Sequence, residues 1–239
     1  MIIVTCTWKN LTARSIPVRK NNTRSFSLNN LYKYFYDFFK PQPPKPPYKH
    51  ICQVGDPVLR GKAKPVEVNE IRSAEFQKSL NCLTEVLRRY DSCGLAAPQI
   101  GIPQQFFAIE FTENSLKTVE PEIIASREIE SIPLTFFINP VVKIKDHTPI
   151  LFPEVCASIH GYQAIVPRAR EVEITALDRL GETFTLSAKG WLARMIQHEY
   201  DHLQGKFYTD KMDASTLSCC IWQEVNKYRG HVKILFRPR

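Results

Sequence analysis

Apolar and polar side chains alternate along this chain with periods that change from segment to segment. Between residues 74 and 90 the apolar positions recur every three or four residues, with Glu, Lys and Arg between them. This period predicts an amphipathic helix. Apolar runs at 106–111 and 136–144 predict strands, and the alternation over 163–177 predicts a strand pair or one bent strand.

The C-terminal third repeats this mixture of elements. A turn at 178–182 leads to a predicted strand at 183–186, and Ser187 has the side chain of an N-cap for a helix over 190–203. A last helix is predicted over 214–228. Helices interspersed with hairpins, without regular βαβ alternation, indicate an α+β domain.

Charge separates the N-terminal fifty residues from the rest. They hold nine Lys or Arg and one acid, so their net charge is +8, the same as that of the whole chain of 239 residues. The remainder is neutral, which argues against a phosphate-binding surface, so we expect no direct nucleic-acid binding. No apolar run approaches the length that a membrane span needs, so we expect no membrane insertion.

The basic N-terminal segment is also rich in Ser, Thr and Asn, as mitochondrial transit peptides are. A secretory signal fits less well, because no positive segment precedes the first apolar residues; a basic tail without a targeting role is the plainer alternative. Five prolines within 41–47 predict a stiff linker. The expected organisation is a mitochondrial targeting leader over 1–40, a linker over 41–49 and one domain over 50–239. Seven cysteines without framework spacing suggest mostly free thiols.

The predicted helix over 190–203 contains the sequence Gln-His-Glu-Tyr-Asp-His at 197–202. His198 and His202 are four residues apart, so both imidazoles can face one metal ion, and Glu199 lies beside them as a candidate base. Two exposed histidines that bind nothing are the alternative. Residues after 202 form no recognisable third-ligand motif, so the third ligand should lie upstream. Cys156 is a candidate, although a lone cysteine is more often a small core residue.

Four segments, in order, resemble the motifs of the peptide deformylase family. They are Gly-Asp-Pro-Val-Leu-Arg at 55–60, Gly-Leu-Ala-Ala-Pro-Gln at 94–99, Glu-Val-Cys-Ala-Ser at 154–158 and the His-containing segment at 197–202. The resemblance covers about residues 50–228 and, with the leader, is closest to the mitochondrial type of animals. It implies antiparallel sheets packed around a central helix that bears the metal-binding motif.

The resemblance also implies a site and a reaction. Cys156, His198 and His202 would bind one divalent ion, Fe(II) or Zn, for which Co can substitute. Glu199 would act as general base and then acid, and Gln99 would stabilise the oxyanion together with the N–H of Ala157. The substrate would be the N-formyl group of formyl-methionyl peptides and nascent chains in the mitochondrial matrix. A contact with the mitochondrial ribosome and a homodimer are further expectations.

Substrate-binding positions follow from the same resemblance. Gly94 and Leu95 would bind the substrate backbone as an added strand. The complete set of expected substrate-binding residues is Cys93, Gly94, Leu95, Val155, Ala157, Trp191 and Met195.

Val155 departs from the family pattern, which has glycine before the metal-binding cysteine. If that position requires a positive φ, valine would strain the backbone, and its bulk would narrow the cleft. An alternative function is therefore a weak or inactive relative that binds metal and formyl-Met peptides without turnover. The intact Glu199 argues against it. A general metallopeptidase is a more distant third possibility.

Overall fold

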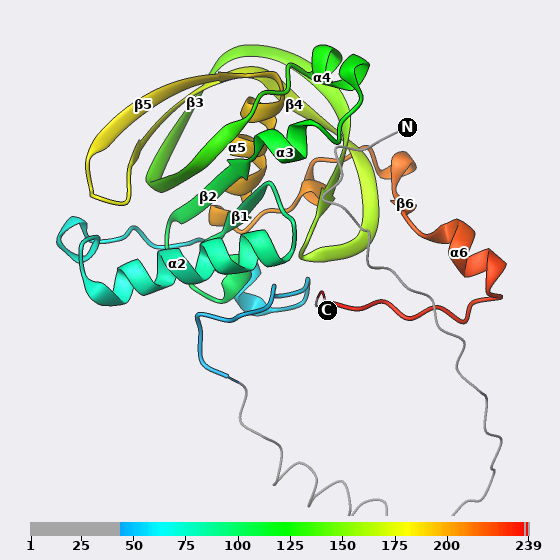
Figure 1. Ribbon diagram of the computed structural model, residues 1–239, viewed down its shortest axis with the longest axis horizontal. Helices are drawn as coiled ribbons and strands as arrows, with labels where there is room; N and C mark the ends of the chain where they lie inside the picture. Colours follow the sequence, from blue (N-terminus) through cyan, green and yellow to red (C-terminus); the bar gives the residue numbers. More distant parts are fainter. Residues whose placement is uncertain (1–43, 237, 239) are drawn as a thin grey trace, which may run out of the picture.

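The computed structural model describes residues 44–236 and 238, which form one mixed helix and strand domain (Figure 1). The α-helices are α2 (Ala74–Arg89), α3 (Glu113–Leu116), α4 (Pro121–Arg127), α5 (Gly190–Leu203) and α6 (Trp222–Lys227). The strands are β1 (Gly94–Ala96), β2 (Phe106–Phe111), β3 (Ile132–Cys156), β4 (Ile159–Leu177), β5 (Thr183–Lys189) and β6 (Ser218–Cys219). Short 3-10 helices are η1 (Pro57–Leu59), η2 (Val68–Glu70), η3 (Ala97–Ile100), η4 (Tyr208–Asp210) and η5 (Ala214–Thr216).

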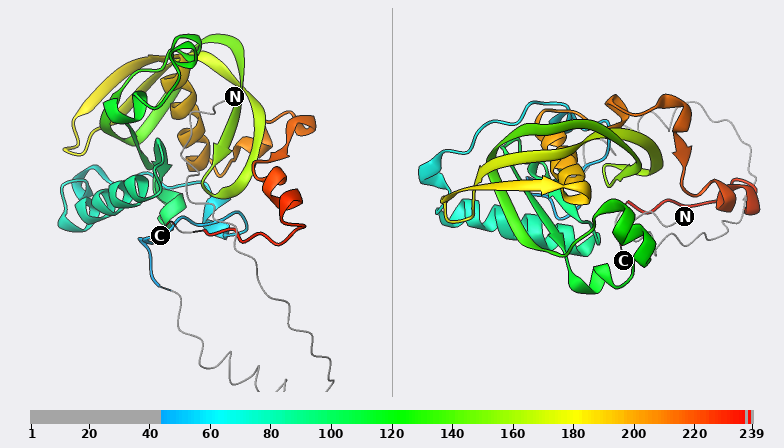
Figure 2. Two further views of the ribbon diagram at one scale, coloured as in Figure 1. Left: turned by 45° about the vertical axis from the view of Figure 1, so that its right-hand side comes forward. Right: turned by 90° about the horizontal axis from the view of Figure 1, so that it is seen from above.

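All strand pairs are antiparallel, in the order β1-β2-β3-β4-β5, with β6 added to β4. The long strands β3 and β4 form a hairpin that bends over the domain, and the sheet curves around α5 (Figures 1 and 2). Helix α5 contacts each strand from β1 to β5. The α+β fold class, with antiparallel strands around a central helix, is confirmed.

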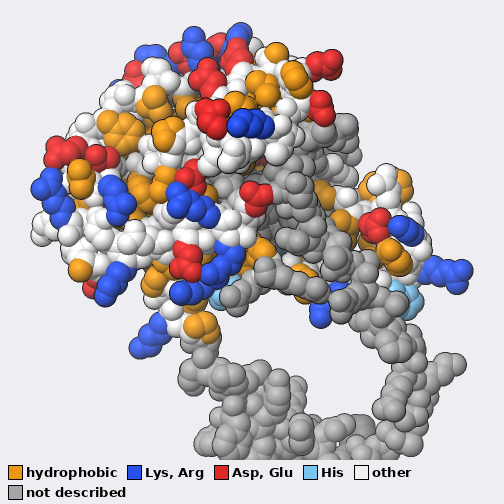
Figure 3. Space-filling view, in the orientation of Figure 1, with side chains coloured by type: hydrophobic (Ala, Val, Ile, Leu, Met, Phe, Trp, Pro, Cys, Tyr) orange, Lys and Arg blue, Asp and Glu red, His pale blue; other side chains and the backbone are white. Residues whose placement is uncertain are grey.

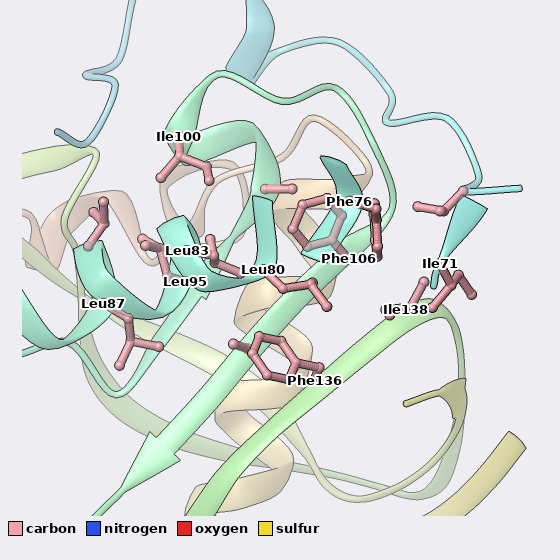
Figure 4. Packing of buried hydrophobic residues seen from close by; sticks show 14 of the residues in the cluster. Ile71, Phe76, Leu80, Leu83, Leu87, Leu95, Ile100, Phe106, Phe136 and Ile138 are labelled. Carbon is pink, nitrogen blue, oxygen red and sulfur yellow. The ribbon is translucent and has the colours of Figure 1, made fainter. Parts of the chain in front are cut away.

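Helix α2 covers one face of the sheet (Figure 4). Its buried side chains include Leu80, Leu83 and Leu87, which pack with Phe106 and Phe136 of the sheet. Ser73 caps the helix, since its side chain accepts a hydrogen bond from Phe76 N. The helix predicted over 74–90 is therefore confirmed, and its apolar period of three to four residues is the reason it packs on the strands.

Two predictions at helix ends are wrong. Ser187 lies inside β5, where it pairs with Glu173, and the residue that precedes α5 is Lys189, without a side-chain cap. Pairing with β4 therefore overrides the local capping preference of Ser187. The helix predicted over 214–228 divides into η5, β6 and α6, because the strand between them pairs with β4.

The leader over 1–40 and residues 41–43 of the linker lie outside the described residues. Tyr48 belongs to the domain, since its N–H donates to Ile100 O at 2.8 Å. No helix among the described residues is long and apolar enough to span a bilayer. The six described cysteines are free thiols. Basic and acidic side chains are interspersed on the face in view in Figure 3, as the neutral charge of this region leads one to expect.

Candidate metal centre and active site

The three expected ligands meet at one point of the fold. Cys156 ends β3, and His198 and His202 lie one turn apart on α5. One ligand atom from each lies within 4.8 Å of the others, and Cys156 Sγ is 3.3 Å from His202 Nε2. Donors around a tetrahedral Zn²⁺ lie roughly 3.5 Å apart, given bonds of about 2.0–2.3 Å. The donor set and its spacing fit a divalent transition metal.

The turn between β3 and β4 holds Cys156 against the helix. Ser158 O accepts from Val54 N at 2.8 Å, and Ala157 O accepts from Gln53 Nε2 at 2.9 Å. Cys156 also pairs with Ile159 across the tight turn. The segment before η1 therefore fixes the position of the cysteine from outside the hairpin.

Glu154 orients His198. Its Oε2 lies 2.9 Å from His198 Nδ1, and an ionised carboxylate can only accept, so Nδ1 donates and Nε2 is left for a metal. Burial disfavours the charge on Glu154, yet hydrogen bonds from Arg168 and His198 hold the pKa of its carboxyl well below the ordinary range. The sequence placed Glu154 in a motif without assigning it a role.

Arg168 links the carboxylate of Glu154, which contacts His198, to Asp201 on α5. It donates twice to Glu154, at 2.8 and 2.9 Å, and once to Asp201 at 2.5 Å. Lys211 also donates to Asp201, at 2.7 Å. Burial lowers the pKa of Arg168, but Glu154 reverses this effect and the net shift is upward. The network was missed, although Arg168 shares the inward face of β4 with Val166, where a charge signals a buried ion pair.

His202 is 1% exposed, and burial lowers its pKa well below the ordinary range. Its imidazole is therefore neutral, the form whose lone pair binds metals. Phe207 packs edge-on against the ring, with centroids 5.5 Å apart. His202 thus lies in an apolar environment, in contrast to His198 with its carboxylate partner.

Glu199 is 5% exposed and lies on α5 between the two histidines in sequence. Strand β1 passes directly over it: a Cβ on Gly94 would lie 2.5 Å from Glu199 Oε1 and 2.9 Å from Cδ. Only glycine fits there without moving the carboxylate. The expected base and the expected substrate-binding strand are therefore in contact.

Gln99 is also brought into the site, 2% exposed. Its Oε1 accepts from Ala96 N at 2.9 Å, which turns Nε2 toward Ser158 Oγ at 3.1 Å and Cys156 Sγ at 3.8 Å. The amide donor thus points to the cysteine ligand.

The expected substrate-binding residues differ in whether their backbone or their side chain is accessible to a ligand. Strand β1 ends the strand order, so within the described residues its outer edge carries no other strand. Leu95 is fully buried in the core beneath α2, which leaves its backbone but not its side chain for a ligand. Cys93 and Trp191 pack against the same two apolar clusters, one of which contains Met195.

Val155 lies within β3 and pairs with Gln163. It is not among the described non-glycine residues with positive φ, so valine causes no left-handed strain there. Ala157, two residues later, is half-buried at the turn between β3 and β4. The backbone therefore gives no support to the inactive alternative.

Comparisons with known proteins agree on one family. The family described as polypeptide deformylase matches residues 48–217. The mitochondrial peptide deformylase of Homo sapiens is 46% identical over 184 residues, covering 77% of this chain and 76% of the human protein. The chloroplastic/mitochondrial peptide deformylase 1A of Arabidopsis thaliana is 41% identical over 166 residues, covering 70% of this chain and 62% of that protein. A Synechococcus elongatus peptide deformylase in complex with actinonin has a TM-score of 0.57 and 29% identity, covering 84% of this chain and 95% of that one.

Proposed function

This chain belongs to the peptide deformylase family, metal-dependent hydrolases of formylated peptides, and we propose that Glu199 works with a metal held by Cys156, His198 and His202 to remove the N-formyl group. The observation that carries this proposal is the convergence of the three ligand atoms within 4.8 Å beside a buried carboxylate. A divalent metal held by these three residues would supply Lewis acidity for the attack of water at neutral pH.

Proton transfer, stabilisation of the oxyanion and alignment of the peptide are assigned to residues of this chain. Glu199 takes the proton from the attacking water and delivers it to the leaving amine nitrogen. Gln99 Nε2 and the N–H of Ala157 donate to the oxygen of the formyl group as negative charge develops on it. The outer edge of β1 at Gly94 aligns the peptide as an added strand. Cys93, Trp191 and Met195 surround the methionine side chain, and Val155 borders the peptide from the opposite hairpin.

We propose Fe(II) or Zn as the ion, since a thiolate with two imidazoles suits both, with Co as a working substitute. The substrates are formyl-methionyl peptides and nascent chains, and the place of action is the mitochondrial matrix. The similarity to the human mitochondrial protein supports this location. The leader over 1–40, contact with the mitochondrial ribosome and a homodimer belong to the same proposal.

The test is turnover of formyl-Met-Ala-Ser by the purified chain loaded anaerobically with Fe(II), Zn or Co. Metal-dependent release of formate that is lost in Glu199→Ala supports both the activity and the base. A protein that binds one metal and turns over nothing contradicts the proposal. Recovery of activity in Val155→Gly would then identify the inactive relative.

A further inference from the structure

The C-terminal end of the chain returns from α6 to the body of the domain. A turn with Arg229 at φ +50° and Gly230 at φ +83° follows α6. Residues 231–236, here called the C-terminal strap, then run past the hairpin of β3 and β4 toward the end of α2 (Figures 1 and 2). The strap forms no helix or strand, and three of its apolar side chains are half-buried, namely Val232, Ile234 and Leu235.

The strap touches both sides of the proposed peptide path, which runs between the outer edge of β1 and the turn that joins β3 to β4. On the hairpin side, Ile234 Cδ1 lies 3.9 Å from the position that a Cβ on Gly161 would take. The ring centroids of Phe236 and His160 are 5.7 Å apart. On the other side, the hydroxyl of Tyr90, which follows α2, donates to Phe236 O at 3.0 Å.

These contacts lie just beyond the residues that would hold the peptide. His160 comes three residues after Ala157 of the hairpin turn. Tyr90 comes four residues before Gly94 of β1. The strap therefore connects the two sides of the path next to the proposed site.

A peptide aligned on β1 can leave the site only toward the strap. Residues 95–97 are fully buried and lead to Gln99, which is also buried, so the path is closed in that direction. Residues 91–94 are half-buried or exposed. A peptide with its formyl group at Glu199 must therefore continue past residues 91–94 toward Tyr90. Since paired extended chains rise equally per residue, it meets the strap at roughly its fourth residue.

The strap is attached less firmly than the strands beside it. The backbone N–H groups of residues 233–236 donate to no backbone acceptor in the part of the chain that the structure describes. The side chain of Phe236 is 54% exposed. Segments with few backbone hydrogen bonds and partial burial open at a low cost in free energy. The strap can therefore lift while the sheet stays paired.

We propose that the C-terminal strap selects peptides by length, with Tyr90 and Phe236 as its specificity-determining residues. A formylated peptide of three residues ends before the strap. A longer chain binds only when the strap has left Tyr90, so its apparent affinity is reduced by the fraction of molecules in which the strap is lifted. This inference rests on the proposed deformylation and leaves the chemistry at the formyl group unchanged.

The experiment compares kcat/KM of the metal-loaded protein on two peptides with amidated C-termini. One is formyl-Met-Ala-Ser, and the other is the same sequence extended by six alternating Gly and Ser residues, so neither carries a charge. We expect the wild type to use the longer peptide about fivefold less efficiently than the tripeptide.

Three variants loosen or remove the strap. They are Tyr90→Phe, Phe236→Ala, which keeps the hydrogen bond from Ile51 N to the Tyr90 hydroxyl, and a chain that ends at Gly230. Each should raise the value for the longer peptide about threefold and leave the tripeptide within about twofold. Matched controls are Lys233→Met for a charge on the strap and Tyr228→Phe for a tyrosine hydroxyl. Both residues are exposed, and their replacement should leave the ratio of the two values unchanged.

Equal values for the two peptides in the wild type would overturn the inference, and so would strap variants that change both values alike. If neither peptide is turned over, the proposed function fails, and trypsin cleavage after Lys233 in the metal-loaded Glu199→Ala protein decides the inference separately. Cleavage that is faster with the longer peptide and unchanged with the tripeptide supports the strap. Equal cleavage rates with both peptides overturn it.

Discussion

Gly94 and Glu199 are in van der Waals contact across the site, so closely that a Cβ on Gly94 would lie 2.5 Å from Glu199 Oε1. The glycine of β1 therefore has a role apart from any contact with a peptide. It leaves the space in which the proposed base lies.

Gly94→Ala should displace the Glu199 carboxylate, because the side chain can move more easily than the strand. We expect kcat to fall at least tenfold, the usual loss when a general base is misplaced. Metal content and unfolding temperature should stay near the wild-type values, since neither the ligands nor the core changes. Steady-state kinetics with metal analysis checks this; a variant that loses its metal would show that Gly94 supports the ligands instead.

Glu154→Gln removes the charged acceptor that orients His198. Loss of such a partner weakens metal binding about 10–100-fold. Competition with a chromogenic chelator measures the affinity. Glu110→Gln is the matched control. Glu110 lies on β2, apart from the ligands, and is paired with Arg88 of α2, so this substitution should leave the metal affinity unchanged.

The pair of Glu110 and Arg88 gives a dependence of stability on pH. The hydrogen bond from Arg88 is the main cause that lowers the pKa of Glu110. A lowered folded-state pKa means that the pair stabilises above the unfolded value, about 4.3, and that this contribution is lost as pH falls through the folded value. Arg88 is 59% exposed, so the effect is at most about 1 kcal/mol.

Urea unfolding of wild type and Glu110→Gln at pH 7 and at pH 3 checks that prediction. The difference in unfolding free energy should shrink at the lower pH. A difference that grew on acidification would contradict the assigned sign.

Leu80→Ala tests the packing of α2 on the sheet. Leu80 is fully buried among Phe106 and Phe136, and removal of a buried leucine costs about 2–5 kcal/mol. Leu180→Ala, at a 56% exposed position, should change stability by less than about 0.5 kcal/mol. Denaturant unfolding in the presence of excess chelator separates this effect from metal binding.

The sequence predicted the elements whose apolar period is long and regular, and it was least reliable where pairing between distant strands decides the structure. Helix α5 and strand β2 lie where their patterns place them. Ser187 was misassigned because pairing with β4, here with Glu173, extends β5 past its predicted end at residue 186. The helix predicted at the C-terminus was broken by β6, whose partner Tyr162 lies more than fifty residues earlier.

The ligand set came from a motif and a resemblance, and the three residues do converge. The hydrogen-bond network around these three ligands could not be predicted from a motif or a resemblance. Arg168 reaches Glu154 and Asp201 from a third element, and such a network depends on how β3, β4 and α5 pack.

The short edge strand β1 has a consequence for open-ended sheet growth between molecules. An open strand edge is a template onto which any extended chain, including a second copy, can add. Here the edge is three residues long, and Ser92 Oγ already donates to Gly94 O. Too few backbone groups remain to nucleate a growing sheet between molecules, while enough remain to align the first residues of one peptide. In the proposed function, this edge aligns a single peptide whose N-terminal end reaches Glu199.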